Sequence, residues 1–136
     1  MTQKPGLTYV DWQDVEVMVY DLVRQIMRSG KQYEVIAGVT RGGLVPAVML
    51  SHMLKLPMIA IAPTDLVEHD HATLIVDEIY DTGKTISKIK SLNPRADIAV
   101  LFHNEGLPEL NYYVIKRQLN DWIVFPWEHH SGENDK

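Results

Sequence analysis

Apolar side chains recur at helical spacing over residues 12–29, near the N-terminal end of the chain. Their spacing places them on one face of a helix. The apolar positions are Val15, Met18, Leu22, Val23 and Ile26. Asp11 is suited to cap the start of this helix, Asp14 can return the hydrogen bond, and Gly30 suits the left-handed conformation at its end. We therefore expect an amphipathic helix whose role is packing.

Further along the chain, short and nearly continuous apolar runs are typical of strands that are covered on both faces. These runs occupy residues 34–39, 57–62, 73–76, 98–102 and 112–115. Helical spacing of apolar residues predicts helices over 44–54 and 85–92, and residues 63–71 read as a polar loop.

The order of these segments indicates the architecture. Strand and helix alternate as in βαβ units, which favours an α/β fold with a mostly parallel central sheet and flanking helices. Ligands bind such sheets beyond the carboxyl ends of the strands. We therefore expect the functional site at two loops, residues 39–43 and 77–85.

The size and composition narrow the class of protein. The chain has 136 residues, enough for one domain, which we expect over residues 1–128 with a disordered tail over 129–136. It contains no cysteine, which excludes disulfides and thiolate metal sites. No apolar run is long enough to span a bilayer and no signal peptide is evident, so we expect a cytoplasmic protein without a membrane partner. The net charge of −5 argues against a nucleic-acid partner.

Residues 73–85, which read TLIVDEIYDTGKT, carry the most specific chemistry. A buried strand ends in two adjacent acids, Asp77 and Glu78, and residues 81–85 then open a helix. The free N–H groups and the positive dipole end of a helix start favour a phosphate, and Gly83 lets the backbone approach it. Paired carboxylates can accept two ribose hydroxyls or hold Mg²⁺ through water. The segment thus predicts a pocket for a ribose 5-phosphate.

The same segment has a simpler interpretation, in which an acidic turn precedes a capped helix and binds nothing. The strand, the acid pair, the third acid and Thr-Gly-Lys-Thr nevertheless occur in one order within a short stretch, which favours the ligand site. The spacing of a Walker phosphate loop is absent.

The segment TLIVDEIYDTGKT resembles the motif with which type I phosphoribosyltransferases bind phosphoribosyl pyrophosphate (PRPP). Two further segments resemble the xanthine-guanine (purine) group of that family. Residues 39–46, VTRGGLVP, are similar to its pyrophosphate loop, and residues 121–128, DWIVFPWE, to its C-terminal segment. The resemblance implies the type I fold with a shortened flexible loop and a small C-terminal hood, and purine phosphoribosyltransferase activity with Mg²⁺. It also implies a homo-oligomer, a dimer or a tetramer.

The resemblance implies roles for the acids and the phosphate loop. Asp77 and Glu78 would hold the ribose hydroxyls and organise Mg²⁺, and Asp81 would lie near the purine N7 and act in proton transfer. The 5′-phosphate would be bound largely by the backbone amides of Thr82, Gly83, Lys84 and Thr85.

The resemblance also assigns the leaving-group and base sites. Pyrophosphate would be bound by Thr40, Arg41 and Gly42, with a cis peptide before Arg41. Trp122 would stack on the nucleobase, and the Ile123 carbonyl would accept an exocyclic amine. Structural alternatives stay open: Arg41 pairs with a surface carboxylate, or Trp122 is an ordinary core aromatic. For Trp127 we favour a core role.

The sequence departs from the family pattern at three points. The acid pair is Asp-Glu, where Asp-Asp or Glu-Asp is more common. His103 stands where relatives with 6-oxopurine substrates place a lysine against the exocyclic oxygen, which leaves the preferred base among guanine, hypoxanthine, xanthine and adenine open. The loop at 63–71 is short for a lid. A neighbouring subunit would then cover the site, or turnover is slow, or the protein is a non-catalytic PRPP- or nucleotide-binding regulator.

Overall fold

The computed structural model describes residues 1–80, 82–104, 110–117 and 121–131. The strands are β1 (Thr2–Lys4), β2 (Leu7–Tyr9), β3 (Val35–Val39), β4 (Met58–Ile61), β5 (Thr73–Ile79), β6 (Asp97–His103), β7 (Tyr112–Lys116) and β8 (Trp122–Val124). The α-helices are α1 (Trp12–Ser29), α2 (Leu44–Leu54) and α3 (Lys84–Leu92), and the 3-10 helices are η1 (Asp70–Ala72) and η2 (Pro126–Ser131).

Helix α1 begins and ends where the sequence predicts. The Asp14 N–H donates to the Asp11 carboxylate at 2.8 Å, and the Asp11 N–H donates to the Asp14 carboxylate at 3.0 Å. This reciprocal cap satisfies two N–H groups that a helix start leaves free. Gly30 ends the helix in the left-handed conformation, with φ of 72°.

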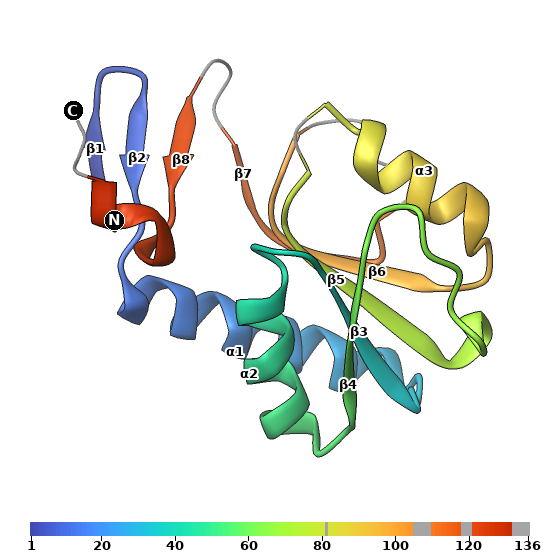
Figure 1. The fold of residues 1–136 in the computed structure, drawn as a ribbon. Coiled ribbons are helices and arrows are strands. Elements are labelled where there is room, and N and C mark those ends of the chain that lie inside the picture. The colour runs from blue at the N-terminus through green and yellow to red at the C-terminus, as the bar shows by residue number, and fades with distance from the viewer. Residues whose placement is uncertain (81, 105–109, 118–120, 132–136) are drawn as a thin grey trace.

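A five-stranded sheet in the order β4-β3-β5-β6-β7 forms the centre of the molecule, and every neighbouring pair is parallel (Figure 1). Successive residues of β3 serve opposite faces: Ile36 packs with α1 and α2, whereas Ala37 packs with α3. The predicted α/β fold with a parallel sheet and flanking helices is thus confirmed. The parallel strands also bring their carboxyl ends to one edge, where the predicted site loops lie.

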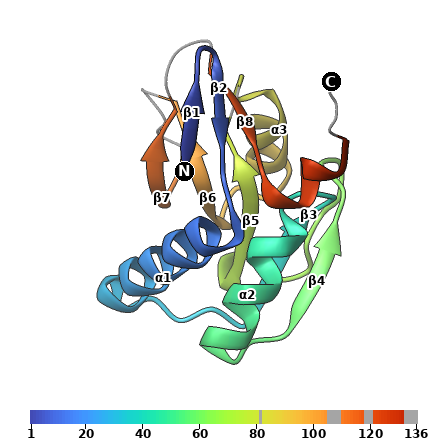
Figure 2. The same ribbon diagram turned by 90° about the vertical axis from the view of Figure 1, so that its left-hand side faces the viewer.

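A second, three-stranded sheet in the order β1-β2-β8 covers this edge and forms the hood (Figure 2). Strand β8 pairs in parallel with β2, so that Leu7 lies opposite Trp122. The hood therefore combines both ends of the chain, whereas the sequence indicated only its C-terminal part. Aromatic contacts join it to the rest: the Phe125 and Phe102 rings lie 5.6 Å apart, and the Trp127 and Trp12 rings 5.8 Å apart.

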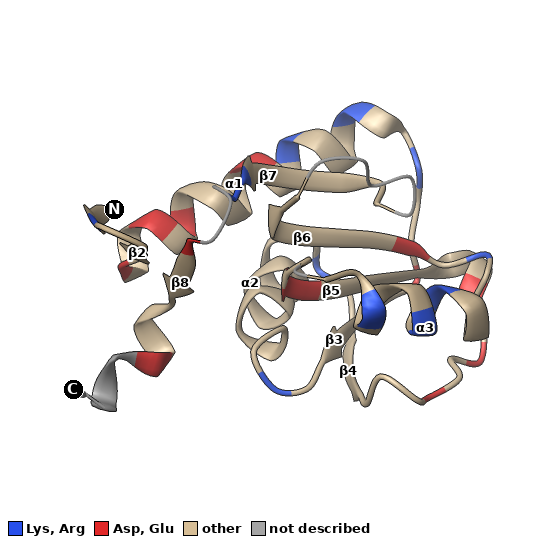
Figure 3. Cartoon of the chain, turned by 90° about the horizontal axis from the view of Figure 1, so that it is seen from above, with Lys and Arg blue, Asp and Glu red and all other residues tan. Residues whose placement is uncertain are grey.

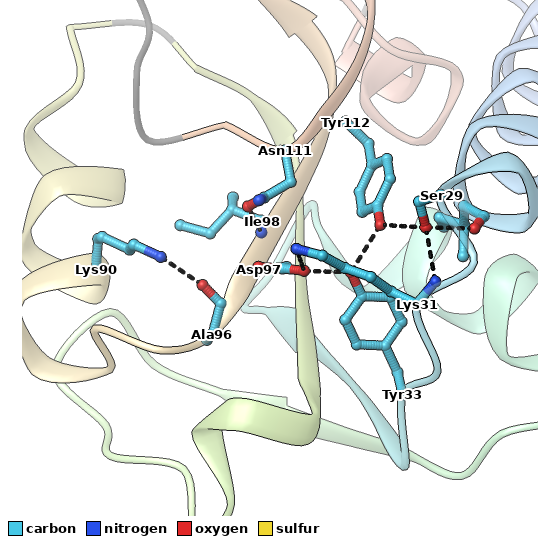
Figure 4. A network of polar contacts seen from close by, with 10 residues as sticks. Ser29, Lys31, Tyr33, Lys90, Ala96, Asp97, Ile98, Asn111 and Tyr112 are labelled. Atoms are coloured by element: carbon cyan, nitrogen blue, oxygen red, sulfur yellow. Dashed lines mark hydrogen bonds and ion pairs between the residues drawn. The ribbon is translucent and has the colours of Figure 1, made fainter.

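A polar network fastens the end of α1 to the starts of β6 and β7 (Figure 4). The Asp97 carboxylate accepts hydrogen bonds from the Tyr33 hydroxyl and, at 2.9 Å, from the Lys31 ammonium. The Tyr33 and Tyr112 hydroxyls lie 2.7 Å apart, and the Tyr112 hydroxyl donates to the Ser29 hydroxyl at 3.0 Å. Burial, with help from these contacts, raises the pKa of Tyr33 above its ordinary value of 10.0. This network lies at the edge of the sheet opposite the predicted site.

The short segment between β4 and β5 is fastened to α3. The buried Asn93 side chain accepts from the Val67 N–H at 2.8 Å and donates to the Asp65 carbonyl at 3.1 Å. The carboxylate of Asp70, at the start of η1, forms an ion pair with Arg95 at 2.9 Å. The predicted polar loop at 63–71 is therefore anchored at both Asn93 and Arg95.

Two remaining expectations concern the tail and the membrane. Helix η2 extends to Ser131, and residues 132–136 of the predicted tail lie outside the described residues, so that prediction stays a prediction. Within the described part of the chain, no helix combines the length and apolar character needed to cross a membrane.

Candidate active site

The carboxyl ends of β3 and β5 meet at one cavity of about 310 Å³. The two strands are neighbours in the sheet, with Gly38 opposite Val76, so the loops that follow them lie side by side. The cavity is lined by Val39, Thr40, Pro63, Asp77, Glu78, Ile79, Thr82, Gly83, Thr85 and Ile86. Two predicted site segments, from the pyrophosphate loop and from the acid pair onward, therefore share one cavity.

The acid pair lies inside β5 and not after it. The sequence predicted a strand over 73–76, but pairing with β6 continues to Ile79, opposite Phe102. Asp77 is 7% exposed, and its carboxylate accepts from the Glu78 N–H at 2.8 Å. Burial raises the pKa of Asp77 well above its ordinary 3.8, and the adjacent Glu78 carboxyl raises it further. A buried carboxyl group beside a half-buried one gains from a cation or from hydroxyl donors.

Glu78 lies where three cavities adjoin. It lines the cavity described above, a second of about 200 Å³ below the hood, and a third of about 500 Å³ beside the loop that follows β3. Burial raises its pKa above the ordinary 4.5, and repulsion from Glu128 adds to the shift. Its carboxylate also fits against Gly42, where any Cβ would overlap it. One carboxylate thus connects the three predicted subsites.

The predicted phosphate loop opens α3, which begins at Lys84, one residue before the predicted start. Gly83 has φ of 86°, a conformation that other residues seldom adopt, and the N–H groups of the first helical turn follow it. The Lys84 N–H donates to the Thr82 hydroxyl at 3.3 Å. Thr82, Gly83 and Thr85 line the first cavity; Lys84 is not among its described lining residues. Figure 3 shows acidic positions on β5 close to the basic start of α3. Asp81 lies outside the described residues.

The predicted pyrophosphate loop has the expected backbone, because the Thr40–Arg41 peptide is cis. The Thr40 N–H donates to the Ile61 carbonyl at 2.9 Å, and the Gly43 N–H donates to the Val39 carbonyl at 3.0 Å, which holds both ends of the loop. Arg41 is exposed and lines the third cavity together with Gly42, Glu78, Trp127 and Glu128. A cation and a glycine beside a helix start suit an anionic group.

The second cavity lies below the hood and has one wide aromatic wall. Trp122 is 66% exposed, so it is not a core aromatic, and Ile123 beside it is buried. Both line this cavity with Glu78, Ile79, Arg117, Phe125 and Glu128. Trp127 instead stacks on Phe125 at 4.8 Å, as the core interpretation expects. An exposed indole face over a small cavity can hold a planar ring.

His103, the third predicted base contact, ends β6 beside this region. Its ring centroid lies 4.3 Å from that of Tyr113, and its Nδ1 lies 2.9 Å from the Asn104 carbonyl. Among the described residues that line the Trp122 cavity, His103 does not occur. Arg117 and Glu128 do, and sequence reasoning missed both. Arg117 directly follows β7, and the rule that sites lie beyond strand ends was a signal that could have found it.

The carboxylates suit a metal that is held together with a substrate. Among the described residues, no group of three or more histidine, aspartate and glutamate side chains could hold a metal unaided. Mg²⁺ is commonly bound by one or two carboxylates plus substrate phosphates. Asp77, which is buried, and Glu78, which is half-buried, line the cavity beside the phosphate loop and fit that donor set.

Comparison with known proteins agrees with this geometry, although no protein-family model matches the chain. The chain is 32% identical to the xanthine-guanine phosphoribosyltransferase of Cereibacter sphaeroides, over 71% of this chain and 70% of that protein. The purine phosphoribosyltransferase of Pyrococcus horikoshii is 34% identical, with 90% of this chain and 94% of that chain covered and a TM-score of 0.72.

A third similarity concerns the fold. The xanthine-guanine-hypoxanthine phosphoribosyltransferase of Helicobacter pylori has a TM-score of 0.73 at 22% identity, covering 90% of this chain and 92% of that one. The parallel sheet, the hood and the identities to named enzymes lead to one conclusion. The chain belongs to the phosphoribosyltransferases of type I, in their xanthine-guanine group.

Proposed function

We propose that the protein transfers the phosphoribosyl group of PRPP to a purine base, with guanine, hypoxanthine or xanthine as the preferred substrates. The products are a nucleoside monophosphate and pyrophosphate. The observation that carries this proposal is the adjacency of three cavities around Glu78: one beside the phosphate loop, one beside the Arg41 loop, and one below Trp122.

Each cavity fits one part of the reactants. The N–H groups at the start of α3 bind the 5′-phosphate, with Thr82 and Thr85 as hydroxyl donors. Asp77 and Glu78 accept the ribose hydroxyls. Thr40, Arg41 and Gly42 bind pyrophosphate. The base stacks on Trp122, and the Ile123 carbonyl accepts an exocyclic amine.

The reaction needs positioning and no covalent nucleophile. A ring nitrogen of the base forms a bond to ribose C1 while the bond from C1 to the pyrophosphate oxygen breaks, through a transition state that resembles an oxocarbenium ion. Asp81 takes part in transferring the proton that the base loses. Asp77 and Glu78 would hold Mg²⁺, and the ion would supply charge neutralisation for the pyrophosphate. Arg41 and the loop amides stabilise the same leaving charge.

The proposal is tested by incubating the protein with PRPP, Mg²⁺ and each purine base in turn. Pyrophosphate and the matching nucleoside monophosphate should form in equal amounts, and chelation of Mg²⁺ should stop both. Without product from any base, the proposed activity is wrong.

The anchored loop favours a second candidate, a non-catalytic PRPP- or nucleotide-binding regulator. Since Asn93 holds the segment at 65–67 against α3, this segment is poorly suited to close over the site as a lid that excludes water. A regulator requires tight PRPP binding and no product with any base, and the same assay, combined with calorimetry, separates the two candidates.

We extend the proposal to a cytoplasmic homo-oligomer, a dimer or a tetramer, in which a neighbouring subunit helps to cover the site. Large apolar side chains exposed along α1, namely Val17, Tyr20 and Met27, support association. Sedimentation measurements test the assembly; a monomer at micromolar concentration contradicts it.

A further inference from the structure

Arg117 is a charged side chain in the base cavity to which the family resemblance gives no role. It follows β7 directly, and its backbone N–H donates to the His103 carbonyl at 2.6 Å, which fixes its position beside the end of β6. The preceding residue, Lys116, is exposed, whereas Arg117 is partly buried and lines the cavity with Trp122 and Ile123.

Arg117 provides hydrogen-bond donors of a kind that His103 does not bring to this cavity. Among the described lining residues, Arg117 carries the only basic side chain. The His103 ring packs on Tyr113, on the neighbouring strand. His103, at the position where relatives place a lysine, therefore does not bring a cation to the cavity that Trp122 lines. Arg117, after the adjacent strand β7, does so.

The chemistry of a guanidinium distinguishes two classes of purine. It has five N–H donors and no acceptor. A 6-oxopurine presents a carbonyl oxygen at C6, which can accept from it, whereas a 6-aminopurine presents an amino donor at the same place. Arginine distinguishes guanine from adenine in nucleic acids by this difference.

We propose that Arg117 determines the base specificity of the protein by donating a hydrogen bond to the C6 oxygen of a 6-oxopurine stacked on Trp122. An amino group at C6 meets a donor at that position and is disfavoured. This inference rests on the proposed function, since it requires the Trp122 cavity to hold the base.

A structural role for Arg117 makes a different prediction. Glu78 and Glu128 line the same cavity, so the guanidinium also offsets their negative charge. If that were its whole role, removing the guanidinium would weaken the binding of all nucleotides by the same factor. A specificity role instead changes the ratio between the 6-oxo and 6-amino nucleotides, which differ in the C6 group and in the N1 proton that accompanies it.

The test is calorimetric binding of inosine monophosphate and adenosine monophosphate, which share phosphate and ribose and differ at C6. We expect the wild type to bind inosine monophosphate about 10- to 100-fold more tightly, the range of one good side-chain contact to a base edge. In Arg117→Met the preference should fall to within about 3-fold, and Arg117→Lys, which keeps a donor, should retain an intermediate preference. Lys116→Met removes a neighbouring charge outside the cavity and should leave the preference intact.

Several outcomes would overturn the proposal. These are a wild type that binds neither nucleotide or shows no preference, an unchanged preference in both Arg117 variants, or an equal loss for both nucleotides. Thermal unfolding of each variant identifies one that does not fold, and Arg117→Lys then decides alone. Binding does not require turnover, so a preference that depends on Arg117 supports this inference even where no base yields pyrophosphate and the proposed activity fails.

Discussion

The roles proposed for Asp77 and Trp122 can be separated from the stability of the fold. Asp77 is buried beside a second carboxyl group, an arrangement that costs free energy in the absence of a ligand. Trp122 exposes most of its side chain and lines the cavity below the hood. A buried carboxyl group and an exposed indole both add little to the stability of a fold, and such residues are typical of functional positions.

We predict that Asp77→Asn lowers kcat/KM for PRPP by about 100-fold or more, the scale of losing a preorganised polar contact at a reacting centre. The carboxamide keeps the shape and removes a buried charge, so the unfolding temperature at neutral pH should stay equal or rise. Steady-state kinetics and thermal unfolding measure the two effects. Full activity in this variant would refute the role assigned to the carboxylate.

We predict that Trp122→Ala raises KM for the purine base by about 5- to 150-fold, because stacking on an aromatic side chain contributes about 1–3 kcal/mol per base. Since the residue is 66% exposed, the free energy of unfolding should change by less than about 0.5 kcal/mol. KM for PRPP provides the internal control and should change little. An unchanged KM for the base would mean that the purine ring does not stack on Trp122.

At the scale of elements, patterns over neighbouring residues were sufficient to predict the α-helices and the strands of the five-stranded sheet. Asp11 and Gly30 mark the ends of α1, and continuous apolar runs identify the parallel strands to within a few residues. The end of β5 was predicted too early because Asp77 and Glu78 look like loop residues. They belong to a strand because β6 pairs with it as far as Ile79.

The hood could not be predicted in full from local pattern. Strand β1 is three residues long and exposed throughout, and β2 finds its parallel partner in β8, more than a hundred residues away. Short strands of this kind are specified by tertiary pairing, which a local pattern does not contain. Arg117 was missed for a related reason, since the cavity that it lines is completed by β8, a strand of the other sheet.

The anchored loop gives a prediction about Asn93. In Asn93→Ala the Val67 N–H loses its acceptor in a partly buried environment, so stability should fall by about 1–3 kcal/mol. The Val67 amide should also exchange with solvent deuterium faster than in the wild type. Ser91→Ala, on the exposed side of the same helix, is the matched control and should change stability by less than about 0.5 kcal/mol. Wild-type exchange at Val67 in the Asn93 variant would show that other contacts hold the loop.

The network around Tyr33 gives a pH-dependent prediction. Tyr33→Phe removes the hydroxyl that contacts Asp97 and Tyr112, and should cost about 1–2 kcal/mol at neutral pH. Because the pKa of Tyr33 is raised in the folded state, its contribution is complete below the unfolded value of 10.0 and declines as the pH rises above it.

The stability difference between wild type and Tyr33→Phe should therefore stay constant from about pH 8 to just below pH 10 and narrow as the pH rises to about 11. Chemical denaturation across this range measures it. Tyr20→Phe, at an exposed position of α1, should show no such trend. A difference that stays constant with pH would mean that Tyr33 ionises equally in the folded and unfolded states.

At the scale of the whole molecule, the site depends on two sheets from distant parts of the chain. The five-stranded sheet supplies the acids and both anion loops, and the hood supplies the aromatic wall. The net charge of −5 does not oppose an anionic substrate, because the proposed anion groups, namely the helix-start amides, Arg41 and a cation held by the acids, would act locally. The motif at residues 73–85 predicted the part of the site that the five-stranded sheet supplies. The hood lies over the same edge of that sheet (Figure 2).

The central claim is that one nucleotide lies across these two parts of the molecule, and a crystal structure with a bound nucleoside monophosphate tests it most directly. We predict that the phosphoryl oxygens accept from the backbone amides of residues 82–85 and that the base lies against Trp122. Phosphoryl oxygens bound anywhere other than at those amides would contradict the account.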